Sequence, residues 1–273
     1  MIFLQLILMA VLQGITEFLP ISSSGHMAFL NALFARAGWE VLEEPVMLEV
    51  LLHLASLLAI LCYYWRSVLR MLLGNDRHLV KLLIVGTIPV GIVGILAKVC
   101  FEEEFDALLG SVKVTGAMML VTAGLLIAAQ QISHINPRLM HWHRLRRNLK
   151  TLSCLRAFGI GCVQALAVLP GLSRSGSTIT AGLAAGMKRQ DAGTFSFLLA
   201  IPAIGAAGLV EILKLFKEGG AGNVEFLPLA VAFLVCFLVS LCALSLLIRL
   251  LRMRCIGYFA FYLIPLGLIM LFL

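Results

Sequence analysis

Long apolar stretches alternate with short polar segments along most of the chain. Six of the stretches are long enough to cross a bilayer as helices, for which about 20 apolar residues suffice. They are residues 46–65, 82–101, 112–129, 195–216, 226–249 and 256–273. The pattern predicts an all-α polytopic membrane protein with about six transmembrane helices.

Four further apolar stretches are too short or too interrupted to span: residues 1–16, 24–36, 155–170 and 177–187. They form two pairs, and a polar turn joins the members of each pair. The turns read "LPISSSG" (19–25) and "LPGLSRSG" (169–176). Short apolar segments of this kind are often re-entrant, so we expect two re-entrant helical hairpins.

Composition supports a single integral membrane domain over residues 1–273. Hydrophobic residues make up 61% of the chain and charged residues only 13%, whereas soluble domains are about half apolar and about a quarter charged. The net charge of +7 does not indicate nucleic-acid binding, because the basic residues lie in short loops between apolar stretches. The seven cysteines include no CxxC pair, so neither a disulfide framework nor a zinc site is expected.

The distribution of Lys and Arg predicts the orientation. Basic residues concentrate in segments 66–81, 130–156, 188–189 and 249–254, which the positive-inside rule assigns to the cytoplasm. The opposite loops are acidic and contain Glu40, Glu43, Glu44, Glu102, Glu103, Glu104, Asp106, Glu218 and Glu225. With this topology the first hairpin enters the membrane from outside and the second from inside.

The two hairpins also resemble each other in sequence. A shift of 151 residues aligns Gln13 with Gln164 and "ISSSG" (21–25) with "LSRSG" (172–176). Together with the opposite orientations, this predicts two inverted-topology repeats, about 1–130 and 152–273, separated by the basic loop 130–156. Non-helical turns at membrane depth must be covered by protein or reached by water, so we expect the two tips to meet around a wet pocket.

The tips carry the chemistry of an anion site. Glu17 and Arg174 are the ionisable residues nearest the two turns, and charges within a membrane usually mark function. The planar guanidinium of arginine suits phosphate. Hydroxyl groups and the N-termini of the following helices would add further donors, so phosphate fits the site best.

A catalytic interpretation follows from the spacing of Ser23 and His26, which share a face if a helix begins near Ser22. A serine within reach of a histidine is a minimal activated nucleophile, and Glu17 could orient the histidine or relay its proton. Simpler interpretations compete: "SSSG" as a helix cap and hinge, and Arg174 as the neutralising partner of Glu17. Glu49 could face the pocket, whereas His53, one turn later, is assigned to packing.

Several motifs resemble one known family. "QGITEFLPISSSGH" (13–26) and "PGLSRSGSTITAG" (170–182) resemble the two signatures of the undecaprenyl-diphosphate phosphatases, the bacitracin-resistance family of bacterial inner membranes. The resemblance extends to "LEVLLHLASLLAI" (48–60) and "FSFLLAIPA" (195–203). It implies two inverted repeats with re-entrant hairpins. It also implies an enzyme that removes the terminal phosphate of a C55 isoprenoid diphosphate and returns the monophosphate carrier to peptidoglycan synthesis.

The resemblance assigns residues by motif position. It implies catalytic roles for Glu17, Ser23, His26 and Arg174, with either Ser23 or His26 as nucleophile. Substrate-binding roles are expected for Gln13, Ser22, Glu49, Ser173 and Thr178. Some relatives have glutamate where this chain has Gln13, so an acidic role is not expected there. The family is associated with divalent cations, so Mg²⁺ or Ca²⁺ is a candidate cofactor. The sequence does not specify its ligands, although Glu17 could be one.

The predicted function is therefore hydrolysis of undecaprenyl diphosphate in the bacterial inner membrane, at a site that opens to the outer side. A lipid-phosphate transporter or flippase using the same inverted-repeat anion site is the alternative. The expected partners are the polyprenyl diphosphate and membrane lipids, with no nucleic acid, and a homodimer is left open.

Overall fold

The secondary-structure elements of the described residues are helices joined by turns, and those residues contain no strand. A computed structural model of residues 1–273 describes the chain except for residues 1, 40–44, 102–106, 135–148 and 218–225. The acidic loops and most of the basic loop 130–156 used to predict orientation therefore lie outside the described residues. The elements are α1 (Ile2–Thr16), α2 (Ser23–Arg36), α3 (Pro45–Tyr63), α4 (Trp65–Leu72), α5 (Arg77–Cys100), α7 (Val112–His134), η2 (Leu149–Thr151), α8 (Cys154–Leu166), α9 (Arg174–Ala184), α10 (Arg189–Lys217), α11 (Phe226–Met253), η3 (Ile256–Tyr258) and α12 (Phe259–Phe272).

Four helices in the described part of the chain are long and apolar enough to cross a membrane: α5, α7, α10 and α11. They coincide with four of the predicted spans. The span predicted at 46–65 is α3, which is bent by 81° relative to α4 and forms with it a broken span or a re-entrant loop. The stretch predicted at 256–273 is a shorter apolar helix, Ile256–Phe272. An all-α integral membrane protein with four or five candidate spans is thus confirmed.

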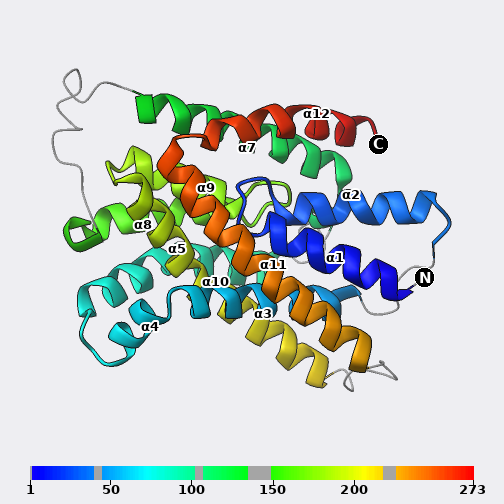
Figure 1. The fold of residues 1–273 in the computed structure, drawn as a ribbon, viewed down its shortest axis with the longest axis horizontal. Coiled ribbons are helices and arrows are strands. Elements are labelled where there is room, and N and C mark those ends of the chain that lie inside the picture. Colours follow the sequence, from blue (N-terminus) through cyan, green and yellow to red (C-terminus); the bar gives the residue numbers. More distant parts are fainter. Residues whose placement is uncertain (1, 40–44, 102–106, 135–148, 218–225) are drawn as a thin grey trace.

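The four short apolar stretches form two helical hairpins. Helices α1 and α2 are joined by the turn 17–22, and helices α8 and α9 by the turn 167–173. In Figure 1 the two hairpins extend toward opposite ends of the molecule, and their turns lie together near its centre. The expected opposition of two polar tips is therefore present.

Each hairpin packs against a long helix of the other half of the chain. Helix α1 packs on α11, and α8 packs on α5. Both contacts are close because glycines line them: a Cβ on Gly161 would collide with the backbone of Gly86, and a Cβ on Gly14 would lie 2.9 Å from the carbonyl oxygen of Cys236. Small residues let membrane helices approach in this way.

Helix α7 supports the second tip. The Thr122 hydroxyl donates to the carbonyl oxygen of Gly171 at 3.1 Å, and the amide of Ser173 donates to the same hydroxyl oxygen at 3.0 Å. Gly171 has φ +87°, and a Cβ there would collide with the backbone of Thr115. The second tip therefore needs glycine at this position, both for its backbone conformation and for its contact with α7.

Candidate active site

The two tips contact each other directly. The amide of Gly171 donates to the Ser24 hydroxyl oxygen at 3.2 Å, and the Ser175 hydroxyl donates to the carbonyl oxygen of Leu19 at 3.4 Å. Ser24 and Ser175 occupy equivalent positions in the two motifs, so each hairpin uses the same serine to hold the opposite tip. Two segments about 150 residues apart in the chain thus form one site.

A serine caps the helix that follows each tip. The Ser22 hydroxyl oxygen accepts from the amide of Gly25 at 3.2 Å, and the Ser173 hydroxyl oxygen accepts from the amide of Gly176 at 3.1 Å. The capping interpretation of "SSSG" is therefore correct, and it coexists with a place in the pocket wall. Ser22 has φ +71°, a conformation that is uncommon for residues other than glycine and that often occurs at functional sites.

Glu17 is the electrostatic centre of the site. Its carboxylate is buried and accepts a 2.6 Å hydrogen bond from Nη2 of Arg174 at one oxygen. The other oxygen accepts from the Ser23 hydroxyl at 2.9 Å and from Nε2 of Gln13 at 3.2 Å. Nε2 of His53 lies 3.8 Å from that same oxygen. Ser23 and Arg174 are equivalent positions in the two motifs, so both tips bind one carboxylate.

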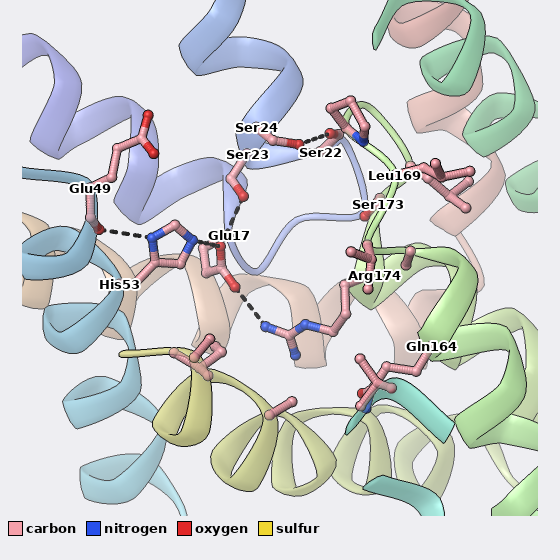
Figure 2. Close-up of a pocket in the computed structure, with 18 of the residues that line it drawn as sticks. Glu17, Ser22, Ser23, Ser24, Glu49, His53, Gln164, Leu169, Ser173 and Arg174 are labelled. Atoms are coloured by element: carbon pink, nitrogen blue, oxygen red, sulfur yellow. Dashed lines mark hydrogen bonds and ion pairs between the residues drawn. The ribbon is translucent and has the colours of Figure 1, made fainter. Parts of the chain in front are cut away.

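The carboxylate faces a cavity of about 690 Å³. Figure 2 shows Glu17 between Ser23 and the guanidinium group of Arg174, with His53 and Glu49 on one side and Gln164 on the other. The polar lining residues are Thr16, Glu17, Ser22, Ser23, Ser24, Glu49, His53, Gln164, Ser173, Arg174 and Glu211.

The rest of the cavity wall is apolar. It is formed by Val50, Val90, Leu109, Ala167, Val168, Leu169, Pro170, Leu172, Ala203, Ile204, Ala207 and Gly208. A site with convergent polar groups at one side and an extended apolar wall suits a ligand with a charged head and a hydrocarbon chain.

Six of the nine predicted site residues line this cavity: Glu17, Ser22, Ser23, Glu49, Ser173 and Arg174. Gln13 lies behind Glu17 and contacts it. Thr178 is buried in α9, where its hydroxyl donates to the carbonyl oxygen of Arg174 at 2.8 Å and lies 2.6 Å from the hydroxyl oxygen of Ser196. Thr178 therefore supports the arginine from behind in this structure.

His26 lies outside the cavity lining. Its Nδ1 is 2.7 Å from the carbonyl oxygen of Ser22, which can only accept, so Nδ1 carries a proton. Its Nε2 is 2.8 Å from the hydroxyl oxygen of Tyr262, which lies parallel to the ring. In a neutral ring Nε2 accepts from Tyr262, so neither nitrogen is free to take a proton from Ser23. The Ser23 hydroxyl instead donates to the carboxylate of Glu17.

His53 is the site residue that sequence reasoning missed. Assigned to packing, it instead lines the cavity and lies beside Glu17, while its Nδ1 donates to the carbonyl oxygen of Glu49 at 2.8 Å. The signal was present: Glu49 and His53 are one turn apart in an otherwise apolar helix, and two polar residues on one face usually share an environment. Gln164, known from the sequence only as the repeat equivalent of Gln13, also lines the cavity.

The carboxylates of the cavity are candidate ligands for a metal ion. The described residues contain no cluster of three or more His, Cys, Asp or Glu side chains that could hold one. Glu17 and Glu49 nevertheless both line the cavity. Magnesium is commonly held by one or two carboxylates together with substrate phosphate oxygens, so these two residues fit a cation that binds with the substrate.

The arrangement has the parts of a phosphoryl-transfer site. The Ser23 hydroxyl is hydrogen-bonded to a carboxylate that can accept its proton. Arg174 uses Nη2 for Glu17, while its buried Nη1 has no hydrogen-bond partner in the part of the chain that the structure describes. A buried unpaired guanidinium nitrogen facing a cavity suits an anionic ligand, because phosphate oxygens would satisfy it.

Comparison with known proteins agrees with this chemistry. The sequence model of the family described as bacitracin resistance protein BacA matches residues 6–269. Relatives described as undecaprenyl-diphosphatase include one from Rhodopirellula baltica, 39% identical over 270 residues that cover 99% of this chain and 97% of the relative. Another, from Halothermothrix orenii, is 36% identical over 94% of this chain and 93% of its own length. A third, from Parabacteroides distasonis, is 33% identical over 97% of this chain and 96% of its own length. The chain therefore belongs to the bacitracin resistance protein BacA family.

Proposed function

We propose that the protein is a membrane phosphatase that hydrolyses undecaprenyl diphosphate to undecaprenyl monophosphate and phosphate. The main support is the binding of one buried carboxylate by Ser23 and Arg174 from opposite tips, in a cavity that also has an apolar wall. The relatives described as undecaprenyl-diphosphatase supply the substrate class. The activity returns the lipid carrier to peptidoglycan synthesis.

The geometry favours Ser23 over His26 as nucleophile. Glu17 takes the Ser23 proton while Oγ attacks the terminal phosphorus. The bond from that phosphorus to the bridging oxygen breaks, and the lipid monophosphate leaves with the electron pair. Nη1 of Arg174 stabilises charge on the transferring phosphoryl group. Glu17 passes the Ser23 proton to the leaving lipid monophosphate and is again a carboxylate. Water then attacks the phosphoserine while Glu17 accepts its proton, the bond from phosphorus to Oγ breaks with the electron pair going to Oγ, and Glu17 returns the proton to Oγ as phosphate is released.

His26 is assigned to positioning in this mechanism. Its Nδ1–H holds the carbonyl of Ser22, the residue before the nucleophile, and Tyr262 fixes the ring from the other side. The alternative in which His26 is itself the nucleophile requires the ring to leave both partners.

A divalent cation, Mg²⁺ or Ca²⁺, is part of the proposal. Glu17 and Glu49 would hold it together with diphosphate oxygens, and it would supply positive charge that offsets the charge of the two phosphates.

The proposed architecture is six transmembrane helices and two re-entrant hairpins, arranged as inverted repeats of residues 1–130 and 152–273 in a single domain. Matched geometry supports the repeats: the hydroxyl oxygens of Ser22 and Ser24 are 3.2 Å apart, and so are those of their equivalents Ser173 and Ser175. The reciprocal packing of α1 on α11 and α8 on α5 is what a two-fold relation between halves would produce.

We propose the bacterial inner membrane as the location, with the site opening to the outer side. The basic segments 66–81 and 249–254 support a cytoplasmic location for the ends of the helices that they join. The homodimer left open by the sequence stays a prediction.

The decisive experiment is phosphate release from undecaprenyl diphosphate by the purified protein in detergent micelles. A transporter using the same site has no compartments to connect there, so release of phosphate identifies an enzyme. Release should depend on Arg174 and Glu17. Absence of release from folded protein, with and without added Mg²⁺ or Ca²⁺, would contradict the proposal.

A further inference from the structure

Gln164 is a buried polar residue in the cavity wall whose side-chain amide has no hydrogen-bond partner among the described residues. It is 2% exposed, and neither its Nε2 nor its Oε1 makes a hydrogen bond. Buried amide groups are nearly always hydrogen-bonded, because leaving them unpaired costs free energy. A pair of unused groups in the wall of a site therefore indicates a partner that arrives from the cavity.

Comparison with the first hairpin shows why the Gln164 amide lacks a partner. The equivalent residue in the first hairpin, Gln13, gives its Nε2 hydrogen bond to Glu17, four residues further along the chain. Four residues after Gln164 stands Val168, whose side chain has no hydrogen-bond acceptor. The second hairpin thus keeps the glutamine and lacks its partner, which leaves the amide available to a ligand.

The unpaired Nη1 of Arg174 is a second donor in the same region. Figure 2 shows the Gln164 side chain on the side of the guanidinium group away from Glu17 and Ser23. A diphosphate whose terminal phosphorus faces Ser23 would extend past Arg174 toward Gln164. The phosphate reached by Gln164 is then the one attached to the lipid.

We propose that Gln164 is a substrate-binding residue whose Nε2–H donates to the phosphate that the lipid keeps. The inference rests on the proposed phosphatase function. It assigns the two phosphates to different ends of the site, the terminal one to Ser23 and the retained one to Gln164, with Arg174 between them. Gln164 thereby also binds the monophosphate product.

The test is Gln164→Leu, which preserves side-chain size and removes hydrogen bonding. KM for undecaprenyl diphosphate should rise about tenfold to hundredfold, as expected for the loss of a hydrogen bond to a charged group. The inhibition constant of undecaprenyl monophosphate should rise by a similar factor, whereas that of inorganic phosphate, which probes the terminal end, should change less than about threefold. The midpoint of thermal unfolding should stay constant or rise, because an unsatisfied amide is replaced by an apolar group.

The matched control is Gln5→Leu, which changes a buried glutamine of α1 that does not line the cavity and should leave KM unchanged. An unaltered KM and product inhibition in Gln164→Leu would overturn the inference, as would a lowered unfolding midpoint without a change in KM. Absence of phosphate release from the unaltered protein is a different result: it would overturn the proposed function, and the inference with it.

Discussion

Nη2 of Arg174 donates to the carboxylate of Glu17 across 2.6 Å, although 157 residues separate the two in the chain. Both side chains are largely buried, with 16% and 7% of their surfaces exposed. A buried charge that loses its partner costs far more than the pair contributes. The same contact therefore joins the two hairpins and fixes the guanidinium nitrogen that is left for substrate.

Removing either member of this pair should affect both stability and activity. We expect Arg174→Ala and Glu17→Ala each to abolish detectable phosphate release and to lower the free energy of unfolding by about 3–5 kcal/mol. The double substitution Arg174→Met with Glu17→Gln removes both charges. It should regain much of the thermal stability in detergent and none of the activity. Recovery of activity in the double variant would contradict a catalytic role for the pair.

Ser23 should carry a covalent phosphoryl group during turnover. Ser23→Ala should reduce the rate by several orders of magnitude, because no other hydroxyl is seen to contact Glu17 in the described residues. Mass spectrometry should find the phosphoryl group on Ser23, both in enzyme quenched with acid and in a parallel sample denatured at mildly alkaline pH, where a phosphohistidine would survive. The neighbouring variant Ser24→Ala, which loses the contacts to Gly171 and to the Ser22 hydroxyl but none to Glu17, should cost less than about tenfold. A phosphoryl group found on His26 would reverse the assignment.

Substitutions of His26 and of Tyr262 should reduce the rate of hydrolysis to different extents. His26→Ala should abolish hydrolysis, because it frees the carbonyl of Ser22 and with it the turn that positions Ser23. Tyr262→Phe removes one hydrogen bond and keeps the ring that lies against His26, so a reduction of about tenfold or less is expected. Measurements of kcat on folded protein separate the two, and wild-type activity in His26→Ala would exclude positioning through this residue.

The second tip should not tolerate a side chain at Gly171. Gly171→Ala combines a positive φ with a collision against the backbone of Thr115, so it should lower the unfolding midpoint and the activity together. Gly91→Ala is the matched control, since a Cβ there meets nothing within 4 Å and the residue lies inside helix α5. The control should match or exceed the stability of the unaltered protein.

Divalent cations should be required if Glu17 and Glu49 share an ion with the substrate. We expect a chelator to abolish phosphate release in micelles and added Mg²⁺ or Ca²⁺ to restore it. Glu49→Gln should raise the cation concentration needed for half-maximal activity. Unchanged activity in the presence of chelator would remove the metal from the proposal.

The sequence predicted the parts of the site that depend on chain pattern. Apolar length identified the short hairpins, and the repeated motif identified Glu17 and Arg174 as groups that meet. Helix α4, bent by 81° from α3, was not predicted, because the basic residues of segment 66–81 indicated a loop.

Contacts that depend on three-dimensional placement were beyond the sequence. A histidine in an apolar helix looks like packing until the face of α3 is known, and so His53 was missed. Spacing suggested that His26 would serve Ser23. The partner that occupies its ring is Tyr262, which lies 236 residues away and belongs to a helix that no motif connects with the first tip.

The packing of each hairpin against a long helix of the other half of the chain has a consequence for biosynthesis. A nascent chain inserts Glu17 into the membrane long before the ribosome has made its arginine partner, and α1 before its packing helix α11. Until then Glu17 lacks its arginine partner and has only the contacts of the first half, from Gln13, Ser23 and His53. The site formed by the two tips is complete only when the second half of the chain has been inserted. Catalytic activity is therefore acquired late in translation, and a product truncated before Arg174 would be inactive.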